Sequence, residues 1–169
     1  MNEKLRNIVT AAVFAALTCV ATMLIQIPTL TRGYVNLGDC MVLLAGWICG
    51  AKWGAAAAGI GSALADMIAG YAIYAPGTFI VKALMAVIAA AVAYGLRSHP
   101  LKAHIISGVT AEIFMAAGYF LYEWLFITGS AATAVIGVPE NLIQGAVGVT
   151  AATALMSVKA FTLNRPGKP

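Results

Sequence analysis

Ionisable side chains interrupt the long apolar runs of this sequence at only a few positions. Moving a charge to the centre of a lipid bilayer costs about 2.5–3.5 kcal/mol on insertion scales, so each such side chain needs a role. Three amides, Asn36, Asn141 and Gln144, occur near the ends of the same runs. The ionisable residues are Asp39, Asp66, Lys82, Glu112, Glu123 and Glu140.

Helical spacing places several of these polar residues on shared faces. Glu112, Tyr119 and Glu123 are separated by seven and four residues, so they share one face of a helix. Asn141 and Gln144 share a face of the last helix in the same way. Stacking rings combined with a few directed polar groups bind flat heteroaromatic ligands. The predicted ligand-binding residues are Tyr34, Asn36, Asp39, Tyr74, Thr78, Lys82, Tyr119, Glu123, Asn141 and Gln144.

Three of the carboxylic residues have alternative roles that the sequence leaves open. Asp66 and Lys82 either line the pocket or form an internal ion pair across the turn between their helices. Glu140 follows Pro139 and could be a helix N-terminal carboxylate that the helix dipole favours. Glu112 lies deepest, with no evident cation, so it is either protonated or in contact with another subunit.

The apolar runs that must position these residues dominate the composition. Hydrophobic residues make up 62% of the 169 residues, and the mean hydropathy is +0.91. A soluble core cannot bury so much apolar surface in a chain of this length, so lipid must be part of the solvent. The runs predict an all-α, integral membrane bundle of six transmembrane helices in one domain, residues 1–169. The predicted spans cover residues 5–26, 37–49, 53–70, 76–96, 103–127 and 139–158.

Basic residues fall in alternate gaps between the runs, and the other gaps carry only Arg32. Short loops rich in Lys and Arg stay cytoplasmic, so both termini are predicted to be cytoplasmic. The ionisable residues, except Glu112, then lie toward the outside. The net charge of +4 follows from this topology and requires no nucleic acid. The basic residues of the inner gaps and ends are Lys4, Arg6, Lys52, Arg97, Lys102, Lys159, Arg165 and Lys168.

Motifs for catalysis, nucleotide binding and metal binding are missing from the sequence. No Gly-x-x-x-x-Gly-Lys-Ser/Thr pattern occurs, so ATP is not this chain's own energy source. The cysteines Cys19, Cys40 and Cys49 lack metal-like spacing and lie in apolar runs. The sequence also lacks paired acid motifs and nucleophile–base spacing. It therefore predicts no enzyme activity, no metal and no cofactor.

Several segments together resemble the substrate-binding S components of energy-coupling-factor (ECF) vitamin transporters. The similarity extends over essentially the whole chain and is greatest to a branch associated with riboflavin, with relatives assigned to pyridoxine or hydroxymethylpyrimidine. The segments that carry it are GYVNLGD at residues 33–39, GIGSALAD at 59–66, YAPGTFIVK at 74–82 and NLIQG at 141–145.

The resemblance implies a multi-pass protein of the bacterial cell membrane that binds a small vitamin in an outward pocket. It further implies association with a membrane-embedded coupling subunit and two cytoplasmic ATPase subunits. In this family, small residues of the first helix make that contact. The matching residues here form two overlapping Ala-x-x-x-Ala pairs, Ala11, Ala12, Ala15 and Ala16.

Three other functions remain open at this point. An ion-coupled carrier could use Glu112, although six short spans without an inverted repeat fit poorly with a stand-alone secondary transporter. A small integral-membrane enzyme acting on lipid would need a catalytic constellation that the sequence lacks. An assembly subunit without ligand would leave the outer carboxyl groups unexplained.

Overall fold

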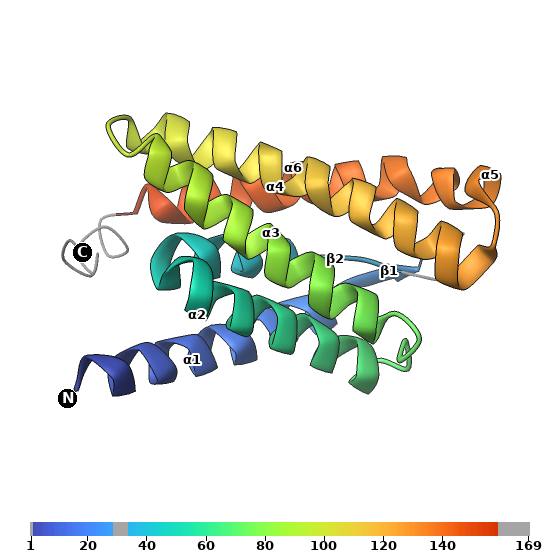
Figure 1. Cartoon of the computed structure of the whole chain (residues 1–169), viewed down its shortest axis with the longest axis horizontal. Coiled ribbons are helices and arrows are strands. Elements are labelled where there is room, and N and C mark those ends of the chain that lie inside the picture. The colour runs from blue at the N-terminus through green and yellow to red at the C-terminus, as the bar shows by residue number, and fades with distance from the viewer. Residues whose placement is uncertain (1, 29–33, 159–169) are drawn as a thin grey trace.

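Helices form nearly all of the computed structural model, which describes residues 2–28 and 34–158 (Figure 1). The predicted all-α class is confirmed, with the addition of a short antiparallel hairpin that was not predicted. Arg32 and the basic tail from Lys159 onward lie outside the described residues. In chain order the elements are α1 (Glu3–Leu24), β1 (Gln26–Pro28), β2 (Tyr34–Asn36), α2 (Gly38–Ile68), α3 (Ala75–Gly95), α4 (Pro100–Tyr122), the π-helix η1 (Glu123–Thr128), α5 (Ala131–Ala134), the 3₁₀-helix η2 (Val135–Gly137) and α6 (Val138–Met156).

The long helices begin and end close to the predicted limits of the apolar runs. The run 76–96 corresponds to α3, in which Pro76 occupies the first turn, where its missing N–H has no helical partner to lose. The run 103–127 continues from α4 into η1 without a break. The predicted outer loop at residues 128–138 instead contains the short helices α5 and η2.

The second and third apolar runs form one bent helix, α2. Gly50 interrupts it with φ 75° and ψ 177°, a conformation that residues with a Cβ atom rarely adopt. The bend lets the two arms of α2 pack against each other. A Cβ atom on Gly54 would lie 2.6 Å from the backbone oxygen of Ala45, so only glycine allows this approach. The predicted turn at residues 50–52 is therefore a bend inside α2.

Small residues bring the other helices close together as well. Gly46 of α2 packs against the backbone of Ala86 in α3, where an added Cβ atom would lie 2.6 Å from the Ala86 oxygen. The centre of the bundle is filled by fully buried side chains, among them Leu43, Met85 and Met115. Close backbone approach through Gly and Ala is the usual packing mode of helices in lipid.

The outer surface of the bundle is strongly apolar. Val20, Ile68 and Leu125 are each more than 60% exposed. Exposing such apolar side chains to water costs free energy, whereas exposing them to lipid does not. Among the residues that the structure describes, four helices are long and apolar enough to cross a membrane: Glu3–Leu24, Gly38–Ile68, Ala75–Gly95 and Pro100–Thr128. These features make the chain a membrane protein.

The helices lie side by side, and the chain reverses direction at each turn (Figure 1). The start of α1 and the end of α6 lie at one end of the bundle. The β1–β2 hairpin, the turn between α2 and α3, and α5 lie toward the opposite end. Segments that are far apart in the sequence therefore meet at that second end.

Substituting Gly61 with alanine is expected to lower the free energy of unfolding by about 1–3 kcal/mol, because overpacking forces the backbones apart. The added Cβ atom would overlap the backbone oxygen of Ala15 and lie 2.9 Å from Cβ of Thr18, both in α1. Gly95→Ala is the matched control, since a Cβ atom added there would meet no atom of another helix within 4 Å. Unfolding titrations of the purified variants in detergent compare the two. Equal stability of both variants would contradict close α1–α2 packing at Gly61.

Candidate functional site

A cavity of about 440 Å³, including its open part, lies at the hairpin end of the bundle. It combines aromatic rings, amides and carboxyl groups, and its walls come from β2, α2, α3, α4, η1, η2 and α6. Rings beside a few directed polar groups are typical of sites that bind small molecules. The lining residues are Tyr34, Asn36, Asp66, Tyr74, Thr78, Tyr119, Glu123, Gly137, Glu140, Asn141 and Gln144.

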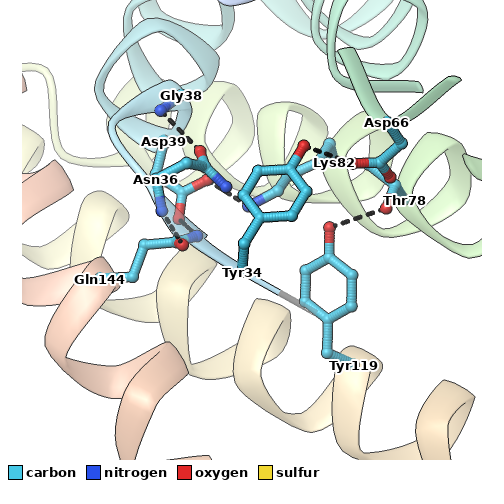
Figure 2. Close-up of polar contacts among 9 residues, drawn as sticks. All are labelled: Tyr34, Asn36, Gly38, Asp39, Asp66, Thr78, Lys82, Tyr119 and Gln144. Carbon is cyan, nitrogen blue, oxygen red and sulfur yellow. Dashed lines mark hydrogen bonds and ion pairs between the residues drawn. The ribbon is translucent and has the colours of Figure 1, made fainter. Parts of the chain in front are cut away.

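A buried ion pair lies behind the cavity wall. Asp39, in the first turn of α2, accepts a hydrogen bond from Nζ of Lys82 in α3 (Figure 2). The two side chains are 1% and 3% exposed, so neither reaches solvent. The Lys82 ammonium also lies over the ring of Tyr119, 5.3 Å from its centroid. The pair joins the beginning of α2 to the middle of the bundle.

Gln144 connects this ion pair to the cavity. Its Nε2 atom donates to Asp39 Oδ2 at 2.6 Å, and its Oε1 atom accepts from the backbone N–H of Asn36 at 2.7 Å (Figure 2). Both ends of the amide are therefore fixed, which assigns its orientation. Asn36 in turn accepts from the backbone N–H of Gly38 at 2.8 Å and so holds β2 against the start of α2.

Two tyrosines are held by hydrogen bonds on the other side of the cavity. The hydroxyl of Tyr34 donates to Asp66 Oδ1 at 2.6 Å, and that of Tyr119 donates to Thr78 Oγ1 at 3.1 Å (Figure 2). Burial, followed by the bond to Asp66, raises the pKa of Tyr34, so this hydroxyl stays protonated and remains a donor. The Tyr34 ring also packs on Tyr71, with 4.6 Å between centroids. These contacts orient the rings before any ligand arrives.

Glu112 lies deeper, against α6. A Cβ atom on Gly145 would lie 3.0 Å from Glu112 Oε2, and one on Gly148 would lie 3.0 Å from Oε1. Glu112 is 4% exposed, and neither carboxyl oxygen finds a donor of good geometry among the described residues. The charged groups that face it are Asp39 and Lys82, so a cation does lie near this residue.

The structure brings together most of the residues predicted to bind a ligand. Eight of those ten line the cavity. Asp39 and Lys82 do not, because they are buried behind the wall and paired with each other. One alternative from the sequence was an ion pair between Asp66 and Lys82. The structure instead pairs Lys82 with Asp39.

Three further residues line the cavity. Asp66 and Glu140 carried a sequence signal, since both are carboxylates at the outer ends of apolar runs. Glu140 also lies in the first turn of α6, so its alternative role beside the helix N-terminus is compatible with its place in the wall. Gly137, in η2, could not be predicted from the sequence, because it has no side chain and contributes only its backbone to the wall.

The alanines of α1 separate into two pairs. Ala11 is buried in the core, and Ala15 packs against it, with its backbone oxygen next to Gly61 of α2. Ala12 and Ala16 are exposed on the outer surface of the helix. The second pair is therefore the more accessible to another protein.

Comparison with known proteins agrees with these features. The chain matches the family described as ECF-type riboflavin transporter, S component, over residues 2–161. It is also 35% identical over 107 residues to a protein of Pyrococcus woesei described as "Uncharacterized protein in gap 3'region", an alignment that covers 61% of this chain and 72% of that protein. Because the family match covers nearly its whole length, this chain belongs to the family of ECF-type riboflavin transporter S components, which are transport subunits and not enzymes.

Proposed function

We propose that this chain captures a small heteroaromatic vitamin from outside the cell and delivers it to an ATP-driven import complex in a bacterial cell membrane. The observation that carries the proposal is the cavity in which three tyrosines, three amides and three carboxyl groups converge at one end of an apolar bundle. Riboflavin, pyridoxine and hydroxymethylpyrimidine types are all candidates for the ligand.

We further propose that the chain crosses the membrane six times with both termini in the cytoplasm. The bend at Gly50 divides α2 into two arms, and these arms, α1, α3, α4 with η1, and α6 would supply the six crossings. Lys82 is buried inside α3. The other described basic residues lie in the segments that the positive-inside rule assigns to the inner side: Lys4, Arg6, Lys52, Arg97 and Lys102. The cavity would then open to the exterior.

Several side chains that would orient a ligand are already held in place. Gln144 is already fixed by Asp39 and by the backbone of Asn36, and the ring of Tyr34 is held by Asp66 and Tyr71. Fixing the side chains beforehand reduces the entropy lost on binding. A flat ligand could stack between the tyrosines, while amides and carboxyl groups at the rim contact its polar edge.

Energy for transport would come from partner subunits, since the sequence carries no phosphate-binding loop. We assign the contact with the coupling subunit to Ala12 and Ala16, the exposed pair on α1. Small side chains allow the backbone of a partner helix to approach closely in lipid. The coupling subunit and two cytoplasmic ATPases complete the proposed importer.

Asn141→Ala is expected to weaken vitamin binding about two- to twelvefold, because one lost hydrogen bond to a ligand costs about 0.5–1.5 kcal/mol, and by more where the loss leaves a buried polar group of the ligand unsatisfied. Asn141 lines the cavity and is half-buried, so the protein should still fold. Mass spectrometry of small molecules that co-purify with the wild-type protein identifies the vitamin, and equilibrium dialysis then measures its affinity for each variant.

Leu142→Ala is the matched control, since this neighbouring side chain is 47% exposed on the lipid-facing surface. It should bind the vitamin as the wild type does. Equal affinity of the Asn141 variant and the control would exclude Asn141 from the binding site. Absence of any co-purifying or added vitamin in the wild-type cavity would refute the proposed function itself.

A further inference from the structure

Glu112 is a buried carboxyl group that lies outside the cavity wall. It is 4% exposed, and neither of its oxygens accepts a hydrogen bond from the residues that the structure describes. An ionised carboxylate buried without a partner is so unfavourable that the group takes up a proton instead. A protonated Glu112 is a hydrogen-bond donor, and a buried donor needs an acceptor.

The acceptor beside Glu112 is the carboxylate of Asp39. Both side chains meet at Gly148 of α6, where an added Cβ atom would lie 2.9 Å from Cβ of Asp39 and 3.0 Å from Oε1 of Glu112. Their carboxyl groups are within hydrogen-bond reach of each other. Two carboxylates so close together in a buried site repel each other, whereas a carboxyl group and a carboxylate can share one proton.

The neighbours of the two groups decide which one holds the proton. Asp39 accepts hydrogen bonds from the Lys82 ammonium through Oδ1 and from the Gln144 amide through Oδ2, and both donors stabilise its charged form. The charged groups that face Glu112 are Asp39 of α2 and Lys82 of α3, and Lys82 is paired with Asp39. The proton therefore belongs on Glu112. A carboxylate has about four acceptor positions, so Asp39 can accept this third hydrogen bond.

Asp39 connects Glu112 to the cavity wall. Gln144 lines the cavity, and its amide binds Asp39 at one end and the backbone N–H of Asn36 at the other (Figure 2). The next residue, Gly145, makes room for Glu112, since a Cβ atom there would lie 2.8 Å from Cβ of Glu112. Fixing Asp39 from behind therefore also fixes the amide that forms part of the wall.

We propose that Glu112 is a positioning residue, which stays uncharged, donates its proton to Asp39 and thereby holds Gln144 in the orientation that binds the vitamin. The inference rests on the proposed function as a vitamin-binding subunit, and it adds a residue that does not itself touch the ligand. The group formed by Glu112, Asp39 and Lys82 is then neutral as a whole. Ionised Glu112 would leave it with an uncompensated negative charge beside Gln144.

Two variants of similar size separate the proton from the charge and from the volume of this side chain. Glu112→Gln keeps a hydrogen-bond donor and cannot ionise, whereas Glu112→Met keeps the volume and has no donor. Equilibrium dialysis of riboflavin with the full-length protein in detergent is expected to give wild-type affinity for Glu112→Gln and several-fold weaker binding for Glu112→Met. Ile113→Met is the control, because this neighbouring side chain is 58% exposed, and it should bind as the wild type does.

Two results of this comparison would overturn the inference. Weakened binding by Glu112→Gln would mean that Glu112 acts as a charged group. Wild-type affinity of both Glu112 variants would mean that the side chain only fills space. Pyridoxine replaces riboflavin as the probe if the wild type does not bind riboflavin.

Infrared spectroscopy detects the proton itself, without any ligand. A protonated carboxyl group has a C=O stretching band that a carboxylate lacks, so subtracting the spectrum of Glu112→Gln from that of the wild type at neutral pH should leave this band. Absence of the band would overturn the inference. If the wild type binds no vitamin, vitamin capture is refuted, whereas the infrared difference still decides whether Glu112 holds the proton.

Discussion

Replacing Lys82 with methionine is expected to lower the free energy of unfolding by about 3–5 kcal/mol, because it leaves the buried charge of Asp39 without its counter-ion. Both side chains are almost completely buried, so water cannot take the place of the ammonium. Methionine is unbranched and fills nearly the same space, which limits the loss from packing. Reversible SDS-induced unfolding, followed by tryptophan fluorescence, measures the change.

Double variants identify the partner of Lys82. Combining Lys82→Met with Asp39→Asn removes both charges, and replacing a buried ion pair by neutral groups is often neutral for stability. This double variant should therefore recover most of the lost stability. Combining Lys82→Met with Asp66→Asn should not, since the ion pair of Lys82 is with Asp39.

Lys102→Met is the control, because this lysine is exposed at the beginning of α4. It should change the stability by a few tenths of a kcal/mol at most, as is usual for surface substitutions. Recovery by the Asp66 variant in place of the Asp39 variant would show that the ion pair lies elsewhere. If Lys82→Met lost ligand binding but kept its full stability, Lys82 would be a ligand-binding residue of the cavity.

The helical elements could be predicted from the sequence because hydropathy and turn residues are local signals. Pro76 marks the first turn of α3, and Gly50 marks the bend of α2 through a conformation that glycine favours. Six helical segments of alternating direction then bring the outer ends of the runs together. That is why eight of the ten predicted ligand-binding residues line one cavity.

The pairing of charges could not be predicted, because it depends on tertiary contacts. Asp39 and Lys82 are 43 residues apart, and Asp66 lies nearer to Lys82 in the sequence, so proximity along the chain favoured the wrong partner. The contact between Gln144 and the Asn36 backbone spans 108 residues. It depends on the β1–β2 hairpin, which three-residue strands do not reveal in a sequence.

Glu112 shows how a shared helix face differs from a shared depth. The spacing to Tyr119 correctly places both residues on the same side of α4, but seven residues correspond to about 10 Å along a helix. Tyr119 reaches the cavity, whereas Glu112 lies against Gly145 and Gly148 of α6 behind it. Periodicity defines a face, and only the packed structure defines which part of that face reaches the ligand.

Ala12→Trp is expected to abolish vitamin uptake by cells while leaving ligand binding unchanged. Ala12 and Ala16 are exposed on α1, away from the cavity, and a tryptophan there would hold a partner helix several ångströms away. Uptake of radiolabelled vitamin by cells that express the complete importer measures the first effect. Equilibrium dialysis of the purified variant measures the second.

Two controls separate docking from folding. Val109 lies as far from the start of α4 as Ala12 lies from the start of α1, and it is 44% exposed. Val109→Trp should therefore leave uptake unchanged. Ala11→Trp enters the core next to Phe14, so it should reduce stability and ligand binding together. Because Ala11 and Ala12 are adjacent in the sequence, these two variants differ only in the face of α1 that receives the ring. Normal uptake by the Ala12 variant would mean that the coupling subunit docks on another surface.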